Sequence, residues 1–186
     1  MPLISHLSSI ISISKELEAE IKFISKKISF LKGQIILNIN QRSDSLYFIE
    51  KGLVRGYYFN NGKEITNWFA QETEFATSFY SFISNKPSYE YIQALEDCEM
   101  VQLKNAELQN LYLKFSETER IGRIITENYY IKLEERLLNL QFKTAKERYQ
   151  KLIEKWPSLL QRASLGQIAS YLGITQETLS RIRSEV

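Results

Sequence analysis

Apolar positions follow two different patterns along the chain. Between Gly33 and about Leu103, short β-branched and aromatic runs alternate with turn residues, which is typical of half-buried strands. Asn60-Asn61-Gly62 is a strong hairpin signal, because Asn and Gly tolerate positive φ angles. Several short strands at this spacing predict a small β-sandwich or barrel. The expected strands are Ile35–Ile39, Ser45–Glu50, Leu53–Phe59, Glu64–Phe69, Tyr91–Leu95 and Cys98–Leu103.

Outside this region the apolar period is helical. Lys15–Ile24 has apolar residues at helical spacing, and residues 117–141 form one long stretch without proline. The long stretch has more apolar positions than one narrow stripe needs. We therefore expect it to pack against its own domain and against a partner helix, with burial inside a monomer as the alternative. A further helix from Thr144 to Trp156 is expected to stop at Pro157.

Ser164–Val186 has the pattern of two short helices joined by a tight turn. Gly173 falls at the turn, and Ala169 falls where two helices would cross closely. If this is a helix-turn-helix, the second helix lies in the major groove of DNA; an ordinary helical hairpin is the alternative. The apolar positions are Leu165, Ile168, Leu172, Ile174, Leu179 and Ile182. The expected helix caps are Ser164 with Gln167, and Thr175.

Composition is that of an ordinary soluble globular protein, with 44% hydrophobic and 25% charged residues in 186. No apolar run is long enough to span a bilayer, and no secretory signal is evident, so we expect a cytoplasmic protein without a membrane partner. The net charge is only +2, but residues 142–186 carry 8 Lys+Arg against 4 Asp+Glu. This bias fits a nucleic-acid-binding module attached to a nearly neutral body.

The order of barrel, long helix and helix-turn-helix resembles the Crp/Fnr family of bacterial transcription regulators over nearly the whole chain. The segments that carry the resemblance are Gly33, LYFIEKGLVRGYY at Leu46–Tyr58, Asn61-Gly62-Lys63-Glu64, ERLLNLQFKTAKERYQKLIEKWP at Glu135–Pro157 and the terminal LGITQETLSRIR. In texture the chain is similar to divergent members from Bacteroidetes-type bacteria.

The resemblance implies an α+β fold. Its parts are a cyclic-nucleotide-binding-like β-roll (a double-stranded β-helix) with flanking helices, a long dimerisation helix and a winged helix-turn-helix. The expected domains are a sensor at residues 1–116, the dimerisation helix at 117–141 and the DNA-binding domain at 142–186. The family continues into a β-hairpin wing, which we expect to be short or missing because the sequence stops at Val186.

The same resemblance assigns base-reading positions to Gln176, Glu177 and Arg181. Gln pairs with adenine, Arg with guanine, and Glu accepts from cytosine. Gln176 stands where the catabolite activator has Arg, so a shared DNA target is not expected. The expected phosphate contacts are Thr178, Ser180 and Arg183. One helix reads few base pairs, so we expect a homodimer on double-stranded DNA, with RNA polymerase as a further candidate partner.

Nucleotide-binding members of the family carry a Gly-Glu pair near a short helix and then an Arg-Ser or Arg-Thr pair. Here no Gly-Glu pair is present, no arginine stands between Arg55 and Arg120, and Glu90 would lie near the phosphate. We therefore expect no cyclic AMP binding in the usual manner. The pocket is expected to hold another ligand or to be filled by aromatics such as Phe79, Tyr80 and Tyr89. The matching pocket positions are Glu74, Phe75, Ala76, Thr77, Ser78, Ser88 and Tyr89.

Other site chemistries find no residues to support them. An iron–sulfur cluster needs about four thiolates, whereas Cys98 is the only cysteine. We expect Cys98 to be a small core residue, with a redox switch as the alternative. His6 is the only histidine and is expected at the surface, which argues against haem, cupin-type metal chemistry and a catalytic triad. The chain is predicted to be a non-enzyme without a cofactor; a small-molecule-binding module with a protein-interaction output is the alternative function.

Overall fold

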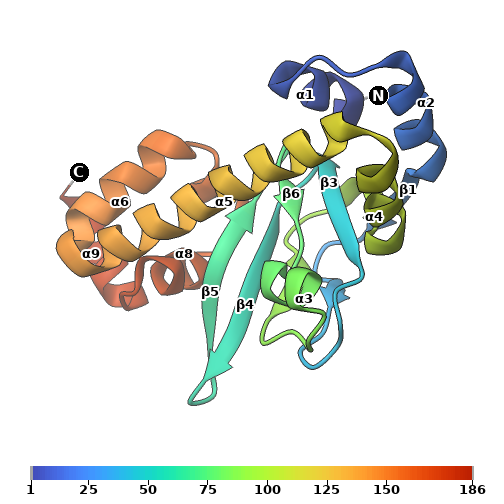
Figure 1. The fold of residues 1–186 in the computed structure, drawn as a ribbon. Coiled ribbons are helices and arrows are strands. Elements are labelled where there is room, and N and C mark those ends of the chain that lie inside the picture. The colour runs from blue at the N-terminus through green and yellow to red at the C-terminus, as the bar shows by residue number, and fades with distance from the viewer. Residues whose placement is uncertain (1, 186) are drawn as a thin grey trace.

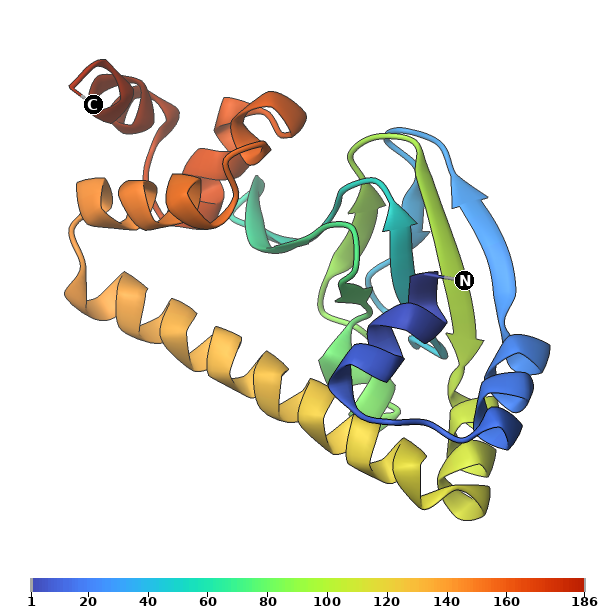
Figure 2. The same cartoon turned by 90° about the horizontal axis from the view of Figure 1, so that it is seen from above.

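The strand region folds into two antiparallel sheets that pack face to face (Figures 1 and 2). The structure, a computed structural model, describes residues 2–185. Within those residues the sheets are paired separately and do not close into one barrel. One sheet has the order β1 (Lys26–Phe30), β8 (Cys98–Lys104), β3 (Ser45–Lys51), β6 (Phe75–Ala76). The other has the order β2 (Ile35–Leu37), β7 (Tyr91–Ala94), β4 (Val54–Asn60), β5 (Lys63–Ala70).

The hairpin between β4 and β5 is confirmed. Asn60 pairs with Lys63, so Asn61 and Gly62 form a two-residue loop. Both loop residues have positive φ, 50° and 76°, as a tight turn matched to the strand twist requires. The register then shifts by one residue at Gly56/Tyr57, which bends β5 toward the C-terminal helices.

The apolar core of the roll lies between the two sheets. Ile49 and Met100 from one sheet meet Val54 and Ala94 from the other, and all four are buried. Cys98 belongs to this cluster, as expected for a small core residue, and burial raises the pKa of its thiol to about 11. A thiol held in this protonated form is a poor nucleophile.

Helices cover the outer face of the first sheet, where Leu46, Phe48, Val101 and Leu103 point away from the roll. The covering helices are α1 (Pro2–Ile10), α2 (Lys15–Ile24), α4 (Asn105–Lys114) and the start of α5. A short helix, α3 (Phe79–Ser84), connects β6 to β7. The prediction of α2 is confirmed, whereas β1, β6 and α4 had no counterpart among the predicted elements.

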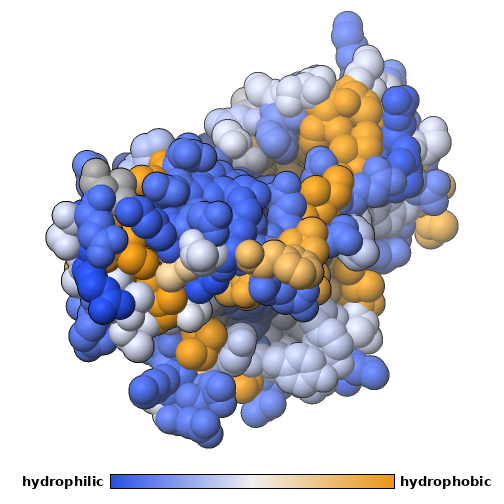
Figure 3. Space-filling view, turned by 90° about the vertical axis from the view of Figure 1, so that its left-hand side faces the viewer, coloured by the Kyte–Doolittle hydropathy of each residue, from blue (hydrophilic) through white to orange (hydrophobic). Residues whose placement is uncertain are grey.

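The long helix α5 runs from Ser116 to Phe142 and spans the molecule from the roll to the C-terminal helices (Figure 2). Its first turns are buried at Thr118 and Ile121. Its second half carries exposed apolar side chains at Tyr130, Ile131, Leu133, Leu137, Leu138, Leu140 and Phe142. Seen from the end that carries the C-terminal helices, the surface is mainly hydrophilic, and apolar side chains gather in a diagonal band (Figure 3).

Four helices form the C-terminal part: α6 (Ala145–Lys155), α7 (Leu159–Arg162), α8 (Leu165–Leu172) and α9 (Gln176–Ser184). Their core shares one buried cluster with Leu53, Phe69 and Leu95 of the roll. Thr144 caps α6 in a capping box with Glu147, and the helix ends before Pro157, where a ring cannot continue it. The C-terminal helices therefore pack directly on the roll (Figure 1).

Candidate functional site

The α8–α9 pair has the predicted helix-turn-helix geometry. Gly173 ends α8 with φ 67°, and its left-handed backbone lets the Ile174 N–H reach the Ala169 carbonyl at 3.0 Å. Ala169 is buried. Two caps act as expected: Ser164 and Gln167 form a capping box on α8, and the Thr175 hydroxyl accepts the Thr178 N–H at 3.2 Å.

The polar face of α9 is open to solvent. Gln176, Glu177 and Arg181, the expected base-reading residues, are all exposed on this short helix. Among the expected phosphate contacts, Ser180 and Arg183 are exposed as well. Thr178 differs, because it is half-buried and its hydroxyl lies 3.1 Å from that of Thr175. Thr178 thus takes part in the N-terminal cap of the helix.

Glu177 lies at the positive end of α9. The pKa of its carboxyl is lowered, chiefly because its own backbone N–H and the Thr175 hydroxyl stabilise the charged form, with a smaller contribution from Lys63. Lys63 sits at the β4–β5 hairpin. The carboxylate therefore has competing partners on the helix itself and on the roll.

Hydrogen bonds fix α8 against the strand β5. The Thr66 N–H donates to the Ser170 hydroxyl at 3.1 Å, and the Ser170 hydroxyl donates to the Gln167 carbonyl at 3.0 Å. Arg136 of α5 donates to the Tyr171 carbonyl at 2.9 Å and stacks its guanidinium 4.0 Å from the centre of the Tyr171 ring. These contacts place the long helix, β5 and the helix-turn-helix in one assembly.

A second contact joins Arg162 to two carboxylates of the roll. Its guanidinium donates to Glu72 at 2.8 Å and also to Glu96. Burial would raise the pKa of Glu72, but the Arg162 guanidinium and the Gly52 N–H outweigh that effect and lower it. The hydrogen bonds to the two carboxylates raise the pKa of Arg162 above its ordinary value, and the bond to Glu96 has the larger effect. Such charge-assisted bonds are stronger than neutral ones.

Some of the predicted pocket positions are buried around α3, and others line a cavity that is described below. Ser78 and Ser88 are buried, and the Ser88 hydroxyl donates to Ser78 at 3.0 Å. Thr77 is buried as well, and its hydroxyl donates to the Ser45 carbonyl at 2.9 Å. Ala76 is buried in the core between the sheets. These side chains therefore make their hydrogen bonds within the protein, around α3.

An unpredicted residue, Trp68, fills the space beside Gly56 between the sheets. Any side chain at position 56 would collide with the indole ring. The indole N–H donates to the Glu90 carboxylate at 3.0 Å. Burial raises the pKa of Glu90, although its hydrogen bonds act in the opposite direction. No local signal marks this contact, because Trp68 and Glu90 meet only through the packing of β5 against the loop after α3.

Of the three aromatics expected to fill the pocket, Phe79 lines a cavity against α5, whereas Tyr80 and Tyr89 are exposed. Phe79 stacks on Tyr129 of α5, with ring centres 3.9 Å apart. Burial, with a contribution from Glu90, raises the pKa of Tyr129 to about 12. Tyr80 and Tyr89 are exposed and hydrogen-bond each other at 2.8 Å, so neither side chain fills the roll.

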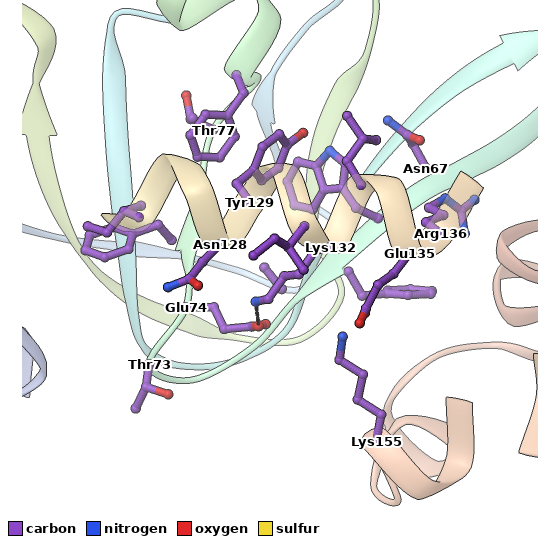
Figure 4. A pocket seen from close by; sticks show the side chains of 18 of the residues that line it. Asn67, Thr73, Glu74, Thr77, Asn128, Tyr129, Lys132, Glu135, Arg136 and Lys155 are labelled. Atoms are coloured by element: carbon purple, nitrogen blue, oxygen red, sulfur yellow. Dashed lines mark hydrogen bonds and ion pairs between the residues drawn. The ribbon is translucent and has the colours of Figure 1, made fainter. Parts of the chain in front are cut away.

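A cavity of about 500 Å³ separates β5 and β6 from the long helix (Figure 4). Glu74, Phe75 and Thr77 line it, and the Lys132 ammonium bonds to Glu74 at 2.7 Å. Glu135 and Lys155 point toward one another across its far end. Both tryptophans, Trp68 and Trp156, also line the cavity. The roll, α5 and the C-terminal helices therefore all contribute to the walls of the cavity.

His6 also lines this cavity, so its prediction as a surface residue is wrong. The imidazole is half-buried and packs on Phe48 and Phe75, with ring centres 5.3 and 5.9 Å away. Burial, followed by the charge of Lys132, lowers its pKa. The sequence did not indicate this packing, because α1 meets β3 and β6 only in the folded protein.

The architecture is that of a cyclic nucleotide-binding domain followed by a long helix and a helix-turn-helix, and the comparisons agree with it. Residues 27–115 match the cyclic nucleotide-binding domain family. No curated protein sequence gives a match to the chain.

Solved structures of regulators share the fold. FixK2 from Bradyrhizobium japonicum is 22% identical with a TM-score of 0.77, covering 87% of this chain and 84% of that one. The c-di-GMP responsive global regulator CLP from Xanthomonas campestris is 15% identical with a TM-score of 0.70, covering 92% and 91%. The Thermus thermophilus catabolite activator protein is 18% identical with a TM-score of 0.61, covering 97% and 85%.

None of the helices in residues 2–185 combines the length and the apolar character that crossing a membrane requires.

Proposed function

We propose that this protein is a transcription regulator of the Crp/Fnr type that binds double-stranded DNA as a cytoplasmic homodimer and has no enzymatic activity. The observation that supports this most strongly is the exposed polar face of α9, held on a capped helix-turn-helix. The match of residues 27–115 to the cyclic nucleotide-binding domain family supports the proposal that this part of the chain is a sensor. The same proposal includes a sensor at residues 1–116, a dimerisation helix at 117–141 and a DNA-binding domain at 142–186. It also includes the similarity to Bacteroidetes-type members.

The DNA-reading residues in this proposal are Gln176, Glu177 and Arg181. They lie on the exposed side of α9, in the first half of the helix and one turn later. Base edges in the major groove offer acceptors to Arg and paired groups to Gln. Ser180 and Arg183 take phosphate contacts; Thr178, already engaged with Thr175, contributes to phosphate binding through its place in the cap.

The dimer in this proposal forms along the second half of α5. Tyr130, Leu133, Leu137 and Leu140 are exposed and follow a spacing of three, four and three residues. That spacing is the a/d pattern of a coiled-coil seam. A pair of such helices buries the apolar side chains and places two copies of α9 on successive DNA half-sites. RNA polymerase remains a further candidate partner.

Cyclic AMP has no usual site in this roll. A cyclic phosphate needs amide donors and a guanidinium or similar cation, but Ser78 and Ser88 bond to each other and Trp68 occupies the space beside Gly56. The half-buried Glu90 carboxyl in the same region, whose pKa is raised by burial, offers no positive charge to a phosphate. The proposed sensor therefore uses another effector or none.

One observation favours the alternative function, a small-molecule-binding module with a protein-interaction output. The cavity of about 500 Å³ has the size of a small-molecule site and borders three parts of the protein. In that alternative the cavity is occupied and α9 contacts a protein.

DNA binding tests the proposal directly. We would measure fluorescence anisotropy with the duplex upstream of the protein's own gene and with a scrambled duplex, across salt and with or without cyclic AMP. A preference for the native duplex that survives rising salt, unchanged by cyclic AMP, is the expected result.

Three other outcomes count against the proposal. A gain that depends on cyclic AMP contradicts the proposed loss of the nucleotide site. Equal, wholly salt-sensitive binding to both duplexes means phosphate attraction alone. Absence of binding to either duplex favours the alternative function.

A further inference from the structure

A second cavity, of about 410 Å³, lies on the outer side of the first sheet, between α3, α4 and the first turns of α5. Its walls come from β3, β6, β8 and the helices α1 to α5, with Leu46, Phe82, Leu103, Leu108 and Ile121 among the lining residues. None of the described residues that line it is charged. It is thus chemically unlike the first cavity, where Lys132, Arg136 and Lys155 meet Glu74 and Glu135.

A buried hydroxyl in this second cavity has no partner. Thr118 is only 6% exposed and lines the cavity near the start of α5. Within residues 2–185, its Oγ1 makes no hydrogen bond. A buried polar group without a partner costs free energy, and such groups are rare in folded proteins. A bound molecule with a hydrogen-bonding group would give this hydroxyl a partner.

Gly122 lets α4 approach α5 closely beside the cavity. A Cβ at this position would lie 2.7 Å from the hydroxyl oxygen of Tyr112, so the phenol of α4 rests directly on the backbone of α5. With a larger residue at 122, the ring would have to move. A glycine costs helix stability relative to alanine, and the close approach of Tyr112 is what this glycine permits.

Water is a poor occupant for such a space. A stably buried water needs two to four polar partners, whereas the walls are mostly leucine, isoleucine and phenylalanine. Among the polar side chains that also line the cavity, Asn105, Gln109 and Thr126 already donate hydrogen bonds within the protein. A charged ligand is disfavoured too, since it would lose its hydration without meeting an opposite charge. An apolar body with one hydrogen-bonding group satisfies both the walls and the hydroxyl.

We propose that this cavity binds an uncharged, mainly apolar small molecule whose single hydrogen-bonding group pairs with the Thr118 hydroxyl. The volume lies within the usual range for small-molecule sites. This site is separate from the DNA-reading helix and from the roll interior, so the proposal stands independently of the proposed function.

Two fluorescent probes with one ring system test the ligand class. N-phenyl-1-naphthylamine is neutral and has one N–H that the Thr118 oxygen can accept. 8-Anilinonaphthalene-1-sulfonate has the same rings and a negative charge. We expect the neutral probe to bind the full-length protein one to one and the sulfonate to bind at least about tenfold more weakly, because desolvating an unpaired charge is costly.

Variants locate the probe. Thr118→Val keeps the shape and removes the hydroxyl, so binding of the neutral probe should weaken about fivefold, the worth of one hydrogen bond. Ile121→Phe should weaken it about tenfold or more by filling the space. Thr66→Val, which removes a buried hydroxyl on β5, should leave it unchanged. Circular dichroism confirms that each variant is folded.

Stability separates a ligand role from a structural one. Thr118→Val should not lower the melting temperature, because the lost hydroxyl bonds nothing in the protein. Thr66→Val should lower it, since its hydroxyl accepts a bond from Arg55. The proposal is overturned if the neutral probe does not bind, if Thr118→Val and Ile121→Phe leave its affinity unchanged, or if the sulfonate binds equally well.

Discussion

At the residue scale, some side chains act on neighbours in the sequence and others on partners far along the chain. Trp68 and Glu90 meet where β5 packs against the loop after α3, and the indole N–H bonds a half-buried carboxylate. Glu90 could be singled out from its place after Ser88 and Tyr89, but no local motif marks its contact with Trp68. By contrast Gly173, Ser164 and Thr175 act within one turn of their own position, so the sequence predicts their backbone roles correctly. Residues whose role is local could be predicted, and residues whose partner lies far along the chain could not.

Glu90 should make stability depend on pH. Its pKa is raised in the folded protein above the ordinary value of 4.5. Protonation of Glu90 stabilises the folded protein. This stabilisation is complete below the ordinary pKa and is lost as pH rises through the raised pKa. Glu90→Gln should therefore be more stable than the wild type at pH 7.5, with the gain vanishing below pH ~4.

Urea unfolding of both proteins at several pH values measures this difference. The exposed glutamate Glu99 provides the control, and Glu99→Gln should show no comparable gain. A Glu90→Gln variant that is less stable than the wild type at pH 7.5 would contradict the prediction.

Two arginines of α9 should differ in what they contribute to DNA binding. Arg181→Ala is expected to cost about 1–3 kcal/mol on the specific duplex and to relax the sequence preference. Arg183→Ala should weaken binding to all duplexes alike and reduce the salt slope by about 1. Anisotropy titrations on matched and mismatched duplexes at several salt concentrations distinguish the two. Equal behaviour of the two variants would remove the assignment.

At the scale of elements, helices and strands with a clear period could be predicted within a few residues. The strand region, α2, α5 and the α8–α9 pair all lie close to their predicted ranges. The missed elements have weak patterns of their own. β1 is a short edge strand with two lysines, and β6 has two residues, so pairing with β8 and β3 defines them. Tertiary context decides such elements.

The exposed apolar side of α5 should carry self-association. Leu137 is 53% exposed, so Leu137→Lys should leave the monomer folded while it places charges in the seam. We expect sedimentation equilibrium to show a dimer for the wild type and at least tenfold weaker association for this variant. Leu113→Lys on α4, at an 87% exposed leucine, is the matched control. A monomeric wild type would contradict the prediction.

At the scale of the molecule, Arg162 ties the C-terminal helices to the roll. Its pairs with Glu72 and Glu96 are partly exposed and therefore screened by solvent. We expect Arg162→Met to weaken this docking by about 1–2 kcal/mol. The Thr66 N–H, which bonds Ser170 across the junction, should then exchange about 5–30 times faster with deuterium.

Arg123→Met is the matched control for that exchange experiment. Arg123 pairs with Glu127 on the exposed side of α5. Its loss should leave the exchange of the Thr66 N–H unchanged. The docking prediction fails if both variants behave alike.

The apolar cluster that Leu53, Phe69 and Leu95 share with Leu152, Ile168 and Leu179 has a consequence for cooperativity. Because two parts of the chain bury one core, neither can open without exposing the other. Scanning calorimetry should show one transition, and a fragment that ends before α6 should unfold at a lower temperature than the full chain, because it leaves the apolar side chains of this cluster uncovered. The roll and the C-terminal helices then melt and form together, so a change in either part alters the thermodynamic state of both.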